Sequence, residues 1–313
     1  MDKNLAIGTD IGGSHIVCAA INLQTGKILR NTLTSRAVDN HALAGTIISV
    51  WAKALAEVIS KVSIEKIRGI GFAMPGPFDY VNGISRMQMQ GVAKYENLYG
   101  LNIADAIKNS LELPNGFIIR FINDASAFAI GEAWTGSAAN FNRSVSVTFG
   151  TGFGSAFINN KIPIVEGSEV PKLGCVYHLP YKEGIVDDYF STRWFVGKYK
   201  SLTGKEINGV KELAKLASKD KIARSLFIEF GHDVAVFLVP WLKKFKAEIL
   251  VIGGNISFAY NLFGDVFESV LKKENCTCKV AISKLKEKSS LIGSAHLLDN
   301  DFWKSIQTVL PLM

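Results

Sequence analysis

Short hydrophobic runs near the start of the chain alternate with turn signals. Leu5–Gly8 is a β-prone run, Thr9–Ser14 is a glycine-rich turn, and Ile16–Ile21 is a second hydrophobic run. The turn signal Gln24–Lys27 follows, and then a further β-prone segment that ends at Leu33. Runs of this length bounded by glycine and polar residues predict strands, so the pattern is strand, turn, strand, turn, strand.

The second half of the chain opens with the same pattern. Ser144–Thr148 predicts a strand, Phe149–Ser155 a glycine turn, and Ala156–Ile158 a second strand. A polar turn then leads to the β-prone segment Ile162–Val165. One pattern used twice, and not as a short-period array, indicates a duplicated β-β-β-α-β-α unit and an α/β fold with two similar lobes.

Between these β-rich segments, apolar residues recur at helical spacing. In Ala42–Val62 the apolar residues stand three or four positions apart, which predicts a long helix. The remaining segments alternate between strand and helix patterns. The predicted strands are Ile67–Met74, Phe117–Ile122 and Glu248–Ile252, and the predicted helices are Ile103–Leu111, Ala125–Trp134, Phe258–Lys272 and Ser289–Leu298.

The composition is that of a globular protein of about two domains. The chain has 313 residues, of which 48% are hydrophobic and 20% charged, so disorder is excluded as the default. The longest strongly apolar run, Val234–Leu242, contains Pro240 and is far shorter than the ~18 residues that a membrane span requires. Met1–Asn4 leads into a short apolar stretch unlike a signal peptide, so we expect a cytoplasmic protein with no membrane partner.

The net charge of +7 is spread along the chain. Short clusters such as Lys243–Lys244 and Lys284–Lys288 are typical of a solvated face, and we expect no nucleic-acid partner. The four cysteines are too few and too scattered for a disulfide framework. Cys276 and Cys278 form the one close pair, and without a second Cys or His cluster beside them we interpret both as structural.

Two glycine turns, one at the start of each repeat, are candidates for binding phosphate. Glycine lets backbone N–H groups approach phosphate oxygens, and clustered N–H groups stabilise negative charge. Neither turn is a Walker A sequence, and the second is followed by strand propensity where a dinucleotide-binding motif needs a helix. A tight β-hairpin would explain either turn alone, whereas two turns in matching positions favour a phosphate clamp. The candidate nucleotide-binding residues in these turns are Asp10, Gly12, Gly13, Ser14, Gly150, Thr151 and Gly152.

Two aspartates accompany these turns. Asp10 lies inside the first turn, where it could cap the turn or hold Mg²⁺ directly or through water. Asp124 follows a predicted strand and precedes a helix, so it could be a helix N-cap or a general base for a substrate hydroxyl. In the company of two phosphate-binding turns, we favour Mg²⁺ binding by Asp10 and base catalysis by Asp124.

Several motifs follow one another along the chain. They are Thr9–Ser14, Pro75–Pro77 with Asp79, Asn123–Asp124, Phe149–Gly154, Ile252–Gly254 and Ile292–Ala295. In this order they resemble the motifs of the ROK family of sugar kinases and repressors, within the actin-like ATPase superfamily. In that resemblance the first and fourth motifs bind phosphate, the second lies on the sugar side, the third binds sugar and catalyses, and the fifth binds adenosine.

The resemblance implies an α/β, duplicated actin-like (ribonuclease H-like) two-lobe fold with a central cleft. It divides the chain into an N-terminal lobe, residues 1–123 completed by a C-terminal helix at 299–313, and a C-terminal lobe, residues 124–298. It also implies ATP and Mg²⁺ as cofactors, a sugar substrate and a homo-oligomer. The residues assigned by resemblance to the sugar are Gly76, Pro77, Asn123, Asp124, His178 and Asp187, and those assigned to adenosine are Gly253 and Gly254.

The chain departs from the family pattern at the sugar-binding positions. The family's Gly-Glu-x-Gly-His stretch corresponds to Gly174–His178, in which His178 is retained and Cys175 stands in place of the Glu. The next acidic sugar ligand of the family, usually Glu, corresponds to Asp187, with Asp188 as a rival alignment. The family's zinc-binding cysteines are missing from the segment that follows His178, so we expect no structural zinc. The two altered ligands predict poor use of unsubstituted glucose.

The sequence therefore predicts ATP-dependent phosphoryl transfer to a hydroxyl of a hexose or aminosugar. Two alternatives stay open. One is an N-acetylated aminosugar kinase, in which loss of the acid at Cys175 makes room for a substituent. The other is a non-catalytic sugar or nucleotide sensor without a DNA-binding domain, since the first phosphate motif already begins at Thr9 and family repressors carry that domain before it. Retention of Asp10 and Asp124 disfavours the sensor.

Overall fold

The computed structural model describes residues 3–87 and 94–313. Two compact units make up the chain: unit 1 comprises Met1–Thr135 with Glu287–Met313, and unit 2 comprises Gly136–Lys286. The first two residues, which entered the expectation about a signal peptide, lie outside the described part. Among the described helices, none is both long and apolar enough to cross a membrane.

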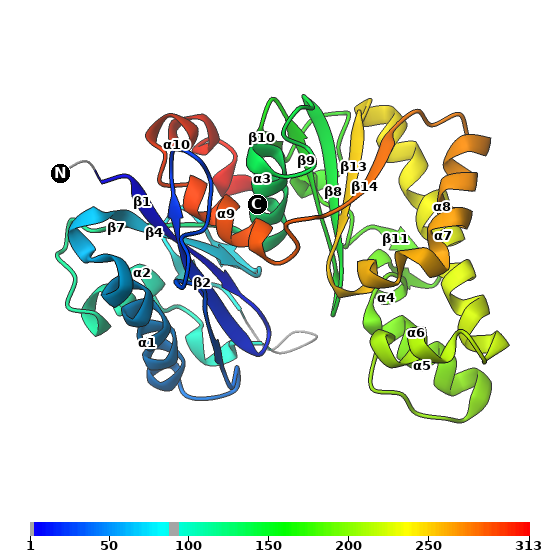
Figure 1. Cartoon of the computed structure of the whole chain (residues 1–313), viewed down its shortest axis with the longest axis horizontal. Coiled ribbons are helices and arrows are strands. Elements are labelled where there is room, and N and C mark those ends of the chain that lie inside the picture. Colours follow the sequence, from blue (N-terminus) through cyan, green and yellow to red (C-terminus); the bar gives the residue numbers. More distant parts are fainter. Residues whose placement is uncertain (1–2, 88–93) are drawn as a thin grey trace. The chain divides into compact units, whose positions relative to one another are not determined.

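Unit 1 contains a five-stranded sheet (Figure 1). Its strands are, in spatial order, β3 (Thr34–Ala37), β2 (His15–Asn22), β1 (Leu5–Ile11), β4 (Ile67–Met74) and β7 (Ile118–Asn123). β1, β2 and β3 pair antiparallel, whereas β4 is parallel to β1 and β7 is parallel to β4. The central strands β1 and β4 are buried along almost their whole length, which explains their nearly continuous apolar sequences.

Two helices of unit 1, α1 and α9, pack on different strands of this sheet. α1 (Ala44–Val62) packs on β2 and β3, and its apolar residues at helical spacing are the buried ones. α9 (Lys288–His296) packs on β1 and β4, and along its length it packs on α3 (Asp124–Thr135). Both faces of the central strands are therefore covered.

Glycines make the packing of α9 possible. A Cβ on Gly8 would lie 1.9 Å from the carbonyl oxygen of Leu291, and one on Gly71 would lie 1.8 Å from that of Ser294. A Cβ on Gly293 would lie 1.9 Å from the carbonyl oxygen of Ala127, on α3. No side chain fits at such distances, so the backbones of α9, α3 and the sheet touch only because these positions are glycine. The motif Ile292–Ala295 is thus part of a packed helix.

This packing places the boundary between the units where we did not expect it. The expected N-terminal lobe ended at residue 123 and resumed at 299, but α3 and α9 both lie in unit 1. The physical reason is the close backbone contact of α9 with β1, β4 and α3, reinforced by a hydrogen bond of 3.0 Å from the Thr9 N–H to Ser294 Oγ. The observed boundaries fall at 135/136 and 286/287.

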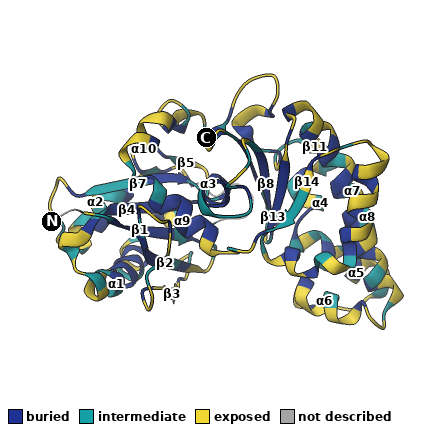
Figure 2. Ribbon diagram, turned by 45° about the horizontal axis from the view of Figure 1, so that its top comes forward, coloured by how far each residue is buried: buried dark blue, intermediate teal, exposed yellow. Residues whose placement is uncertain are grey.

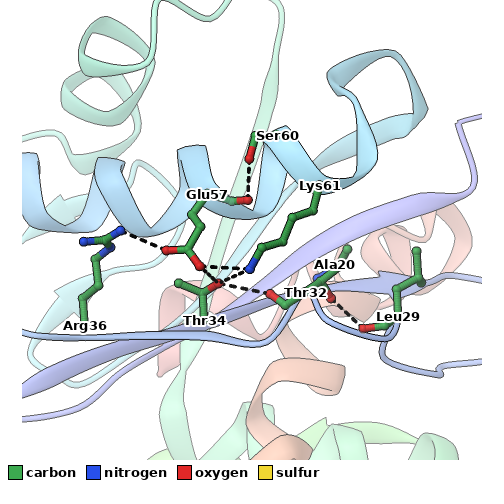
Figure 3. A network of polar contacts seen from close by, with 8 residues as sticks. All are labelled: Ala20, Leu29, Thr32, Thr34, Arg36, Glu57, Ser60 and Lys61. Atoms are coloured by element: carbon green, nitrogen blue, oxygen red, sulfur yellow. Dashed lines mark hydrogen bonds and ion pairs between the residues drawn. The ribbon is translucent and has the colours of Figure 1, made fainter.

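The third strand of unit 1 also begins later than expected. In the segment that ends at Leu33, Ile28 forms an isolated antiparallel bridge with Ile21, and the segment does not continue as a strand. The Thr32 hydroxyl accepts a hydrogen bond from the Ala20 N–H at 3.2 Å and donates to the Leu29 carbonyl at 2.8 Å (Figure 3). The strand starts at Thr34, whose hydroxyl donates to Glu57 on α1 at 3.0 Å.

Unit 2 contains a second five-stranded sheet. Its strands are, in spatial order, β10 (Ile162–Ile164), β9 (Phe153–Asn159), β8 (Arg143–Phe149), β13 (Ile249–Gly253) and β14 (Lys279–Ile282). The first three strands in the sequence pair antiparallel, and β13 is parallel to both β8 and β14. This repeats the order and the directions of the sheet in unit 1, so the duplicated unit predicted from the two glycine turns is confirmed.

The core of unit 2 is rich in phenylalanine. α7 (Lys221–Phe245), the longest described helix, packs on α8 (Tyr260–Lys273), and both bury one face while the other is exposed (Figure 2). The ring of Phe230, in α7, lies edge-on to Phe149 at 5.3 Å and to Phe263 at 5.3 Å between centroids. Aromatic contacts of this kind tie the glycine-turn end of β8 to the helices behind it.

The remaining elements are short and connect or flank the two sheets. They are η1 (Ile64–Lys66), β5 (Phe78–Asp79), β6 (Ile84–Ser85), η2 (Glu96–Leu98), α2 (Ile103–Ser110), η3 (Lys172–Gly174), β11 (Pro180–Tyr181), β12 (Gly184–Ile185), α4 (Val186–Tyr189), α5 (Thr192–Thr203), α6 (Val210–Leu216), η4 (Asn255–Ala259), α10 (Asn300–Ile306) and η5 (Leu310–Leu312).

Candidate active site

The first glycine turn joins β1 to β2 in unit 1. The Gly12 N–H donates to the His15 carbonyl at 2.9 Å, which closes the hairpin, and the Gly12 carbonyl accepts from the Tyr95 hydroxyl at 2.7 Å. Tyr95 is fully buried, with its ring edge-on to Trp51. The turn is therefore a tight β-hairpin, and the buried Tyr95 side chain stabilises it through the hydrogen bond to Gly12. Gly12 and Gly13 are partly exposed and Ser14 is exposed.

A lysine lies beside this turn. The position that a Cβ would take on Gly13 is 3.3 Å from Lys94 Cε and 3.5 Å from Lys94 Nζ. An ammonium group next to backbone N–H groups suits the binding of phosphate. Sequence reasoning did not select Lys94, because an isolated lysine in a loop carries no pattern that distinguishes it from a surface residue.

Asp10 and Asp124 are brought together in unit 1. Loss of hydration, together with weaker repulsion from the nearby carboxylates of Asp124 and Glu287, raises the pKa of Asp10 from its usual 3.8 to about 7. A divalent cation held by Asp10 would relieve the repulsion that this carboxylate feels, so Asp10 fits Mg²⁺. Within the described residues no group of three or more His, Cys, Asp or Glu is placed so that it could hold a metal ion. A few carboxylates without a cage are typical of Mg²⁺ sites that are completed by water and phosphate.

The N-cap of α3 is Asn123, so the neighbouring Asp124 does not cap this helix. Asn123 Oδ1 accepts from the N–H groups of Ala125 and Ser126, at 3.1 and 3.2 Å. Asp124 is the first helical residue, and its Oδ1 accepts from the Ala125 N–H at 2.8 Å and from Asn123 Nδ2 at 3.1 Å. These bonds orient the Asp124 carboxylate at the carboxyl end of β7, a strand that is only partly buried.

The protonation equilibrium of Asp124 is shifted toward neutral pH. Loss of hydration raises its pKa, although the Ala125 N–H, the Lys94 charge and the Asn123 amide each act to lower it. A carboxylate with a raised pKa is a better proton acceptor at neutral pH than an ordinary aspartate. The site therefore has the property that base catalysis requires.

The loop Gly76–Pro77 connects to Asn123 through a tyrosine. It follows β4, and the Gly76–Pro77 peptide bond is cis. The buried Tyr80 donates its hydroxyl to the Met74 carbonyl at 3.1 Å and accepts from Asn123 Nδ2 at 3.4 Å. Asn123 and Asp124 thus belong to one hydrogen-bonded cluster with Tyr80, which the sequence pattern did not indicate, and a Cβ on Gly76 would lie 3.5 Å from the Tyr80 hydroxyl.

Asp79, which the resemblance places beside this loop, has a structural role. Its two carboxylate oxygens accept from the backbone N–H and the side-chain amide of Asn82, both at 2.9 Å. These hydrogen bonds hold the pKa of Asp79 below its usual range. Asp79 therefore closes the turn between β5 and β6.

The second glycine turn joins β8 to β9 in unit 2. The Gly150 N–H donates to the Gly152 carbonyl at 2.9 Å, so this turn is also a closed hairpin, with Thr151 exposed at its tip. The Gly150 carbonyl accepts from both the N–H and the hydroxyl of Thr192, at 2.8 Å each. The turn is thus anchored from α5.

The pair Gly253–Gly254 meets this turn within unit 2. Gly254 has a φ of +77°, and a Cβ there would lie 2.3 Å from the carbonyl oxygen of Phe149. Glycine is therefore required both by the backbone conformation and by the space. The carboxyl ends of the parallel strands β8 and β13 lie side by side, which is where ligands bind in open α/β sheets.

The predicted sugar residues of unit 2 have different surroundings. Cys175 Sγ lies 3.8 Å from His178 Nδ1, and burial raises the pKa of the Cys175 thiol to about 12. Burial and the charge of Lys172 lower the pKa of His178, so a neutral thiol and a neutral imidazole stand side by side at neutral pH. Asp187 instead contacts the glycine turn, where its Oδ1 accepts from the Phe153 N–H at 2.6 Å. Of the two predicted sugar residues His178 and Asp187, His178 lies beside Cys175, the residue that replaces the family's Glu.

A sheet of the same order in each unit, with a glycine hairpin between its first two strands, defines the fold of the actin-like ATPases. The chain belongs to the ROK family, whose sequence profile matches residues 6–301. The glucokinase of Thermotoga maritima is 26% identical over 326 residues, which cover 95% of this chain and 98% of that protein. The N-acetyl-D-glucosamine kinase of Haemophilus influenzae is 25% identical over 274 residues, covering 80% and 84%.

A solved structure gives the same fold. The ROK family glucokinase of Streptomyces griseus, crystallised in complex with glucose and AMPPNP, superposes with a TM-score of 0.70 over 94% of this chain and 98% of that chain, at 20% sequence identity. At this identity the likeness establishes the architecture of the two units.

Proposed function

We propose that this protein is a sugar kinase that transfers the γ-phosphoryl group of ATP to a hydroxyl of a hexose or aminosugar. The observation that carries the proposal is the Asn123–Asp124 pair, in which a carboxylate with a raised pKa is oriented at the end of β7 beside a second carboxylate, Asp10. The relatives named above are a glucokinase and an N-acetyl-D-glucosamine kinase, which supports the same reaction class.

In this proposal each unit supplies defined groups. In unit 1, Asp124 accepts the proton of the sugar hydroxyl, and Asn123 and the Gly76–Pro77 loop bind the sugar. In unit 2, His178 is the proposed sugar-binding residue. The backbone N–H groups of the two glycine turns bind the phosphates, and Gly253–Gly254 borders the adenosine. The Lys94 ammonium adds positive charge beside the first turn.

Mg²⁺ belongs to the proposal through Asp10. When bound, Mg²⁺ neutralises charge on the transferring phosphate groups. Asp10 would hold it directly or through water, and the repulsion of Asp10 by Asp124 and Glu287 favours a cation at that place. A kinase of this type would act in the cytoplasm, and we retain the expectation of a homo-oligomer, which light scattering on the purified protein tests.

The substrate could be an N-acetylated aminosugar. Cys175 replaces an acid by a small, neutral thiol, and a thiol is a weak hydrogen-bond partner. A site without that acceptor has less means to select an unmodified hydroxyl, and it has room for a substituent. A non-catalytic sensor is disfavoured, because a sensor has no need of both the Asp10 and the Asp124 carboxylate.

The proposal is tested by ADP release measured with a panel of hexoses, aminosugars and N-acetylated aminosugars. We expect at least one sugar to be phosphorylated, and Asp124→Asn to abolish turnover with that sugar while AMPPNP still binds. Asp105→Asn, which removes an exposed carboxylate of α2, is the matched control. Full activity of Asp124→Asn would contradict the role of the base, and the absence of turnover on every sugar would favour the sensor.

A further inference from the structure

Asp187 has both carboxylate oxygens engaged within unit 2. Its Oδ1 accepts the hydrogen bond from the Phe153 N–H at 2.6 Å, and its Oδ2 pairs with Arg193 Nη2 at 2.7 Å. A Cβ on Gly152 would lie 2.8 Å from Asp187 Oδ1, so a side chain at residue 152 would push the carboxylate away from its present position. The contact is thus built by two segments of unit 2, the glycine turn at 152–153 and the residues Asp187 and Arg193.

Thr192, the neighbour of Arg193, contacts the first residue of the same turn, Gly150. Thr192 donates twice to the Gly150 carbonyl, so α5 and the Asp187 side chain together contact both ends of the segment from Gly150 to Phe153. The hairpin bond between Gly150 and Gly152 lies between these two anchors. The shape of the turn therefore depends on contacts from outside the sheet.

We infer that Asp187 is a positioning residue for the phosphate-binding turn Gly150–Gly152, in place of the sugar contact that the family pattern implies, and that Arg193 holds it there. The inference rests on the proposed function in one respect, namely that this turn binds nucleotide phosphate. A carboxylate is a stronger acceptor for a backbone N–H than a neutral oxygen, so it fixes the turn firmly. A bare carboxylate beside phosphate would repel it, and the Arg193 guanidinium neutralises that charge.

Steady-state kinetics distinguish the two possible roles of Asp187, positioning of the glycine turn and contact with the sugar. If it positions the turn, Asp187→Ala raises KM for ATP and the Kd for AMPPNP by about tenfold, as the loss of a charge-assisted hydrogen bond implies, and leaves KM for the sugar nearly unchanged. Arg193→Gln should move the same two constants in the same direction. Asp187→Glu, which restores the family's usual residue, should also weaken ATP binding, because its longer arm moves the carboxylate away from its present contact with the Phe153 N–H.

A suitable control is Glu206→Gln. Glu206 pairs with Lys200 at 2.7 Å on the exposed surface of unit 2, so the substitution removes an acid of the same unit from an ion pair that no part of the glycine turn shares. Exposed pairs of this kind contribute little, and all kinetic constants should stay within about twofold of the wild type.

Amide hydrogen exchange tests the inference without any substrate. The Phe153 amide should exchange faster in Asp187→Ala than in the wild type, and more slowly in Glu206→Gln than in Asp187→Ala. Faster exchange together with weaker AMPPNP binding supports the inference. Unchanged exchange, or a rise in KM for sugar with KM for ATP unchanged, overturns it. If the wild type phosphorylates no sugar, the proposed function fails, and the exchange and AMPPNP measurements still decide on Asp187.

Discussion

Asp10 offers the most direct test of the electrostatics of unit 1. Its pKa is raised to about 7, first by loss of hydration and then by the carboxylates of Asp124 and Glu287. Between its usual pKa of 3.8 and about 7, the folded protein binds more protons at Asp10 than the unfolded chain does. Stability therefore falls as the pH rises through this window, and ionised Asp10 opposes folding above it.

The size of the effect follows from the two pKa values. The interval from 3.8 to about 7, at about 1.4 kcal/mol for each pH unit, corresponds to at most about 4 kcal/mol of the free energy of unfolding. Asp10→Asn removes the ionisable group and keeps the size of the side chain. We therefore expect Asp10→Asn to be more stable than the wild type at pH 8 by up to about 4 kcal/mol, and to show no gain at pH 4.

The assay is denaturant unfolding of both proteins at several pH values, with a chelator present so that no divalent cation stabilises the carboxylate. Asp105→Asn, which removes an exposed carboxylate of the same unit, serves as the control and should show little change. A difference between wild type and Asp10→Asn that does not grow from pH 4 to pH 8 would refute the reasoning. Added Mg²⁺ with AMPPNP should stabilise the wild type more than Asp10→Asn, because the substitution removes the carboxylate proposed to bind the cation.

Four further predictions follow from particular residues. Asp124→Asn should lower kcat by roughly 10²–10⁴-fold with little change in AMPPNP affinity, as measured by ADP release and calorimetry; turnover near that of the wild type would exclude a base at this position. A chelator should leave Tm unchanged, and elemental analysis should find less than one zinc per chain, because the family's zinc-binding cysteines are missing; one tightly bound zinc would contradict this. Cys175→Glu should raise kcat/KM for glucose relative to the best substituted sugar, and the role given to position 175 fails if the wild type already prefers glucose and the substitution brings no gain. Gly254→Ala should cost at least about 2 kcal/mol in unfolding experiments, because a Cβ would clash with the backbone of Phe149 and strain a φ of +77°; equal stability would mean that the turn relaxes freely.

Much of the fold could be predicted because its signals are local. A glycine turn between two β-prone runs needs only neighbouring residues to form a hairpin, and both turns are hairpins in the structure. The helix predicted from Ala42 to Val62 spans Ala44–Val62 for the same reason, since the spacing of apolar residues along one segment decides which face is buried. Repetition of the pattern was sufficient to predict two similar units.

The candidate site was predicted less completely. Asp10 and Asp124 were selected from their positions next to glycine turns and strand ends, and the structure brings them together. Lys94, Tyr80 and Tyr95 were not selected, because each reaches the site from a loop with no pattern of its own. Their contacts depend on how the chain returns to the sheet.

The sequence by itself determined the two repeats, the glycine turns and the acidic residues beside them, since turn formation and strand pairing follow from residues close together in the chain. Only the tertiary structure decided that α3 and α9 belong to unit 1 and that Asp187 contacts the glycine turn. The first outcome depends on the absence of a side chain at positions such as Gly71, which lies against the backbone of α9. The second depends on the hydrogen bond that the Phe153 N–H donates to Asp187. A glycine in the sequence shows that another segment can approach closely, but it does not show which segment. That is decided only when the segments pack in the folded protein.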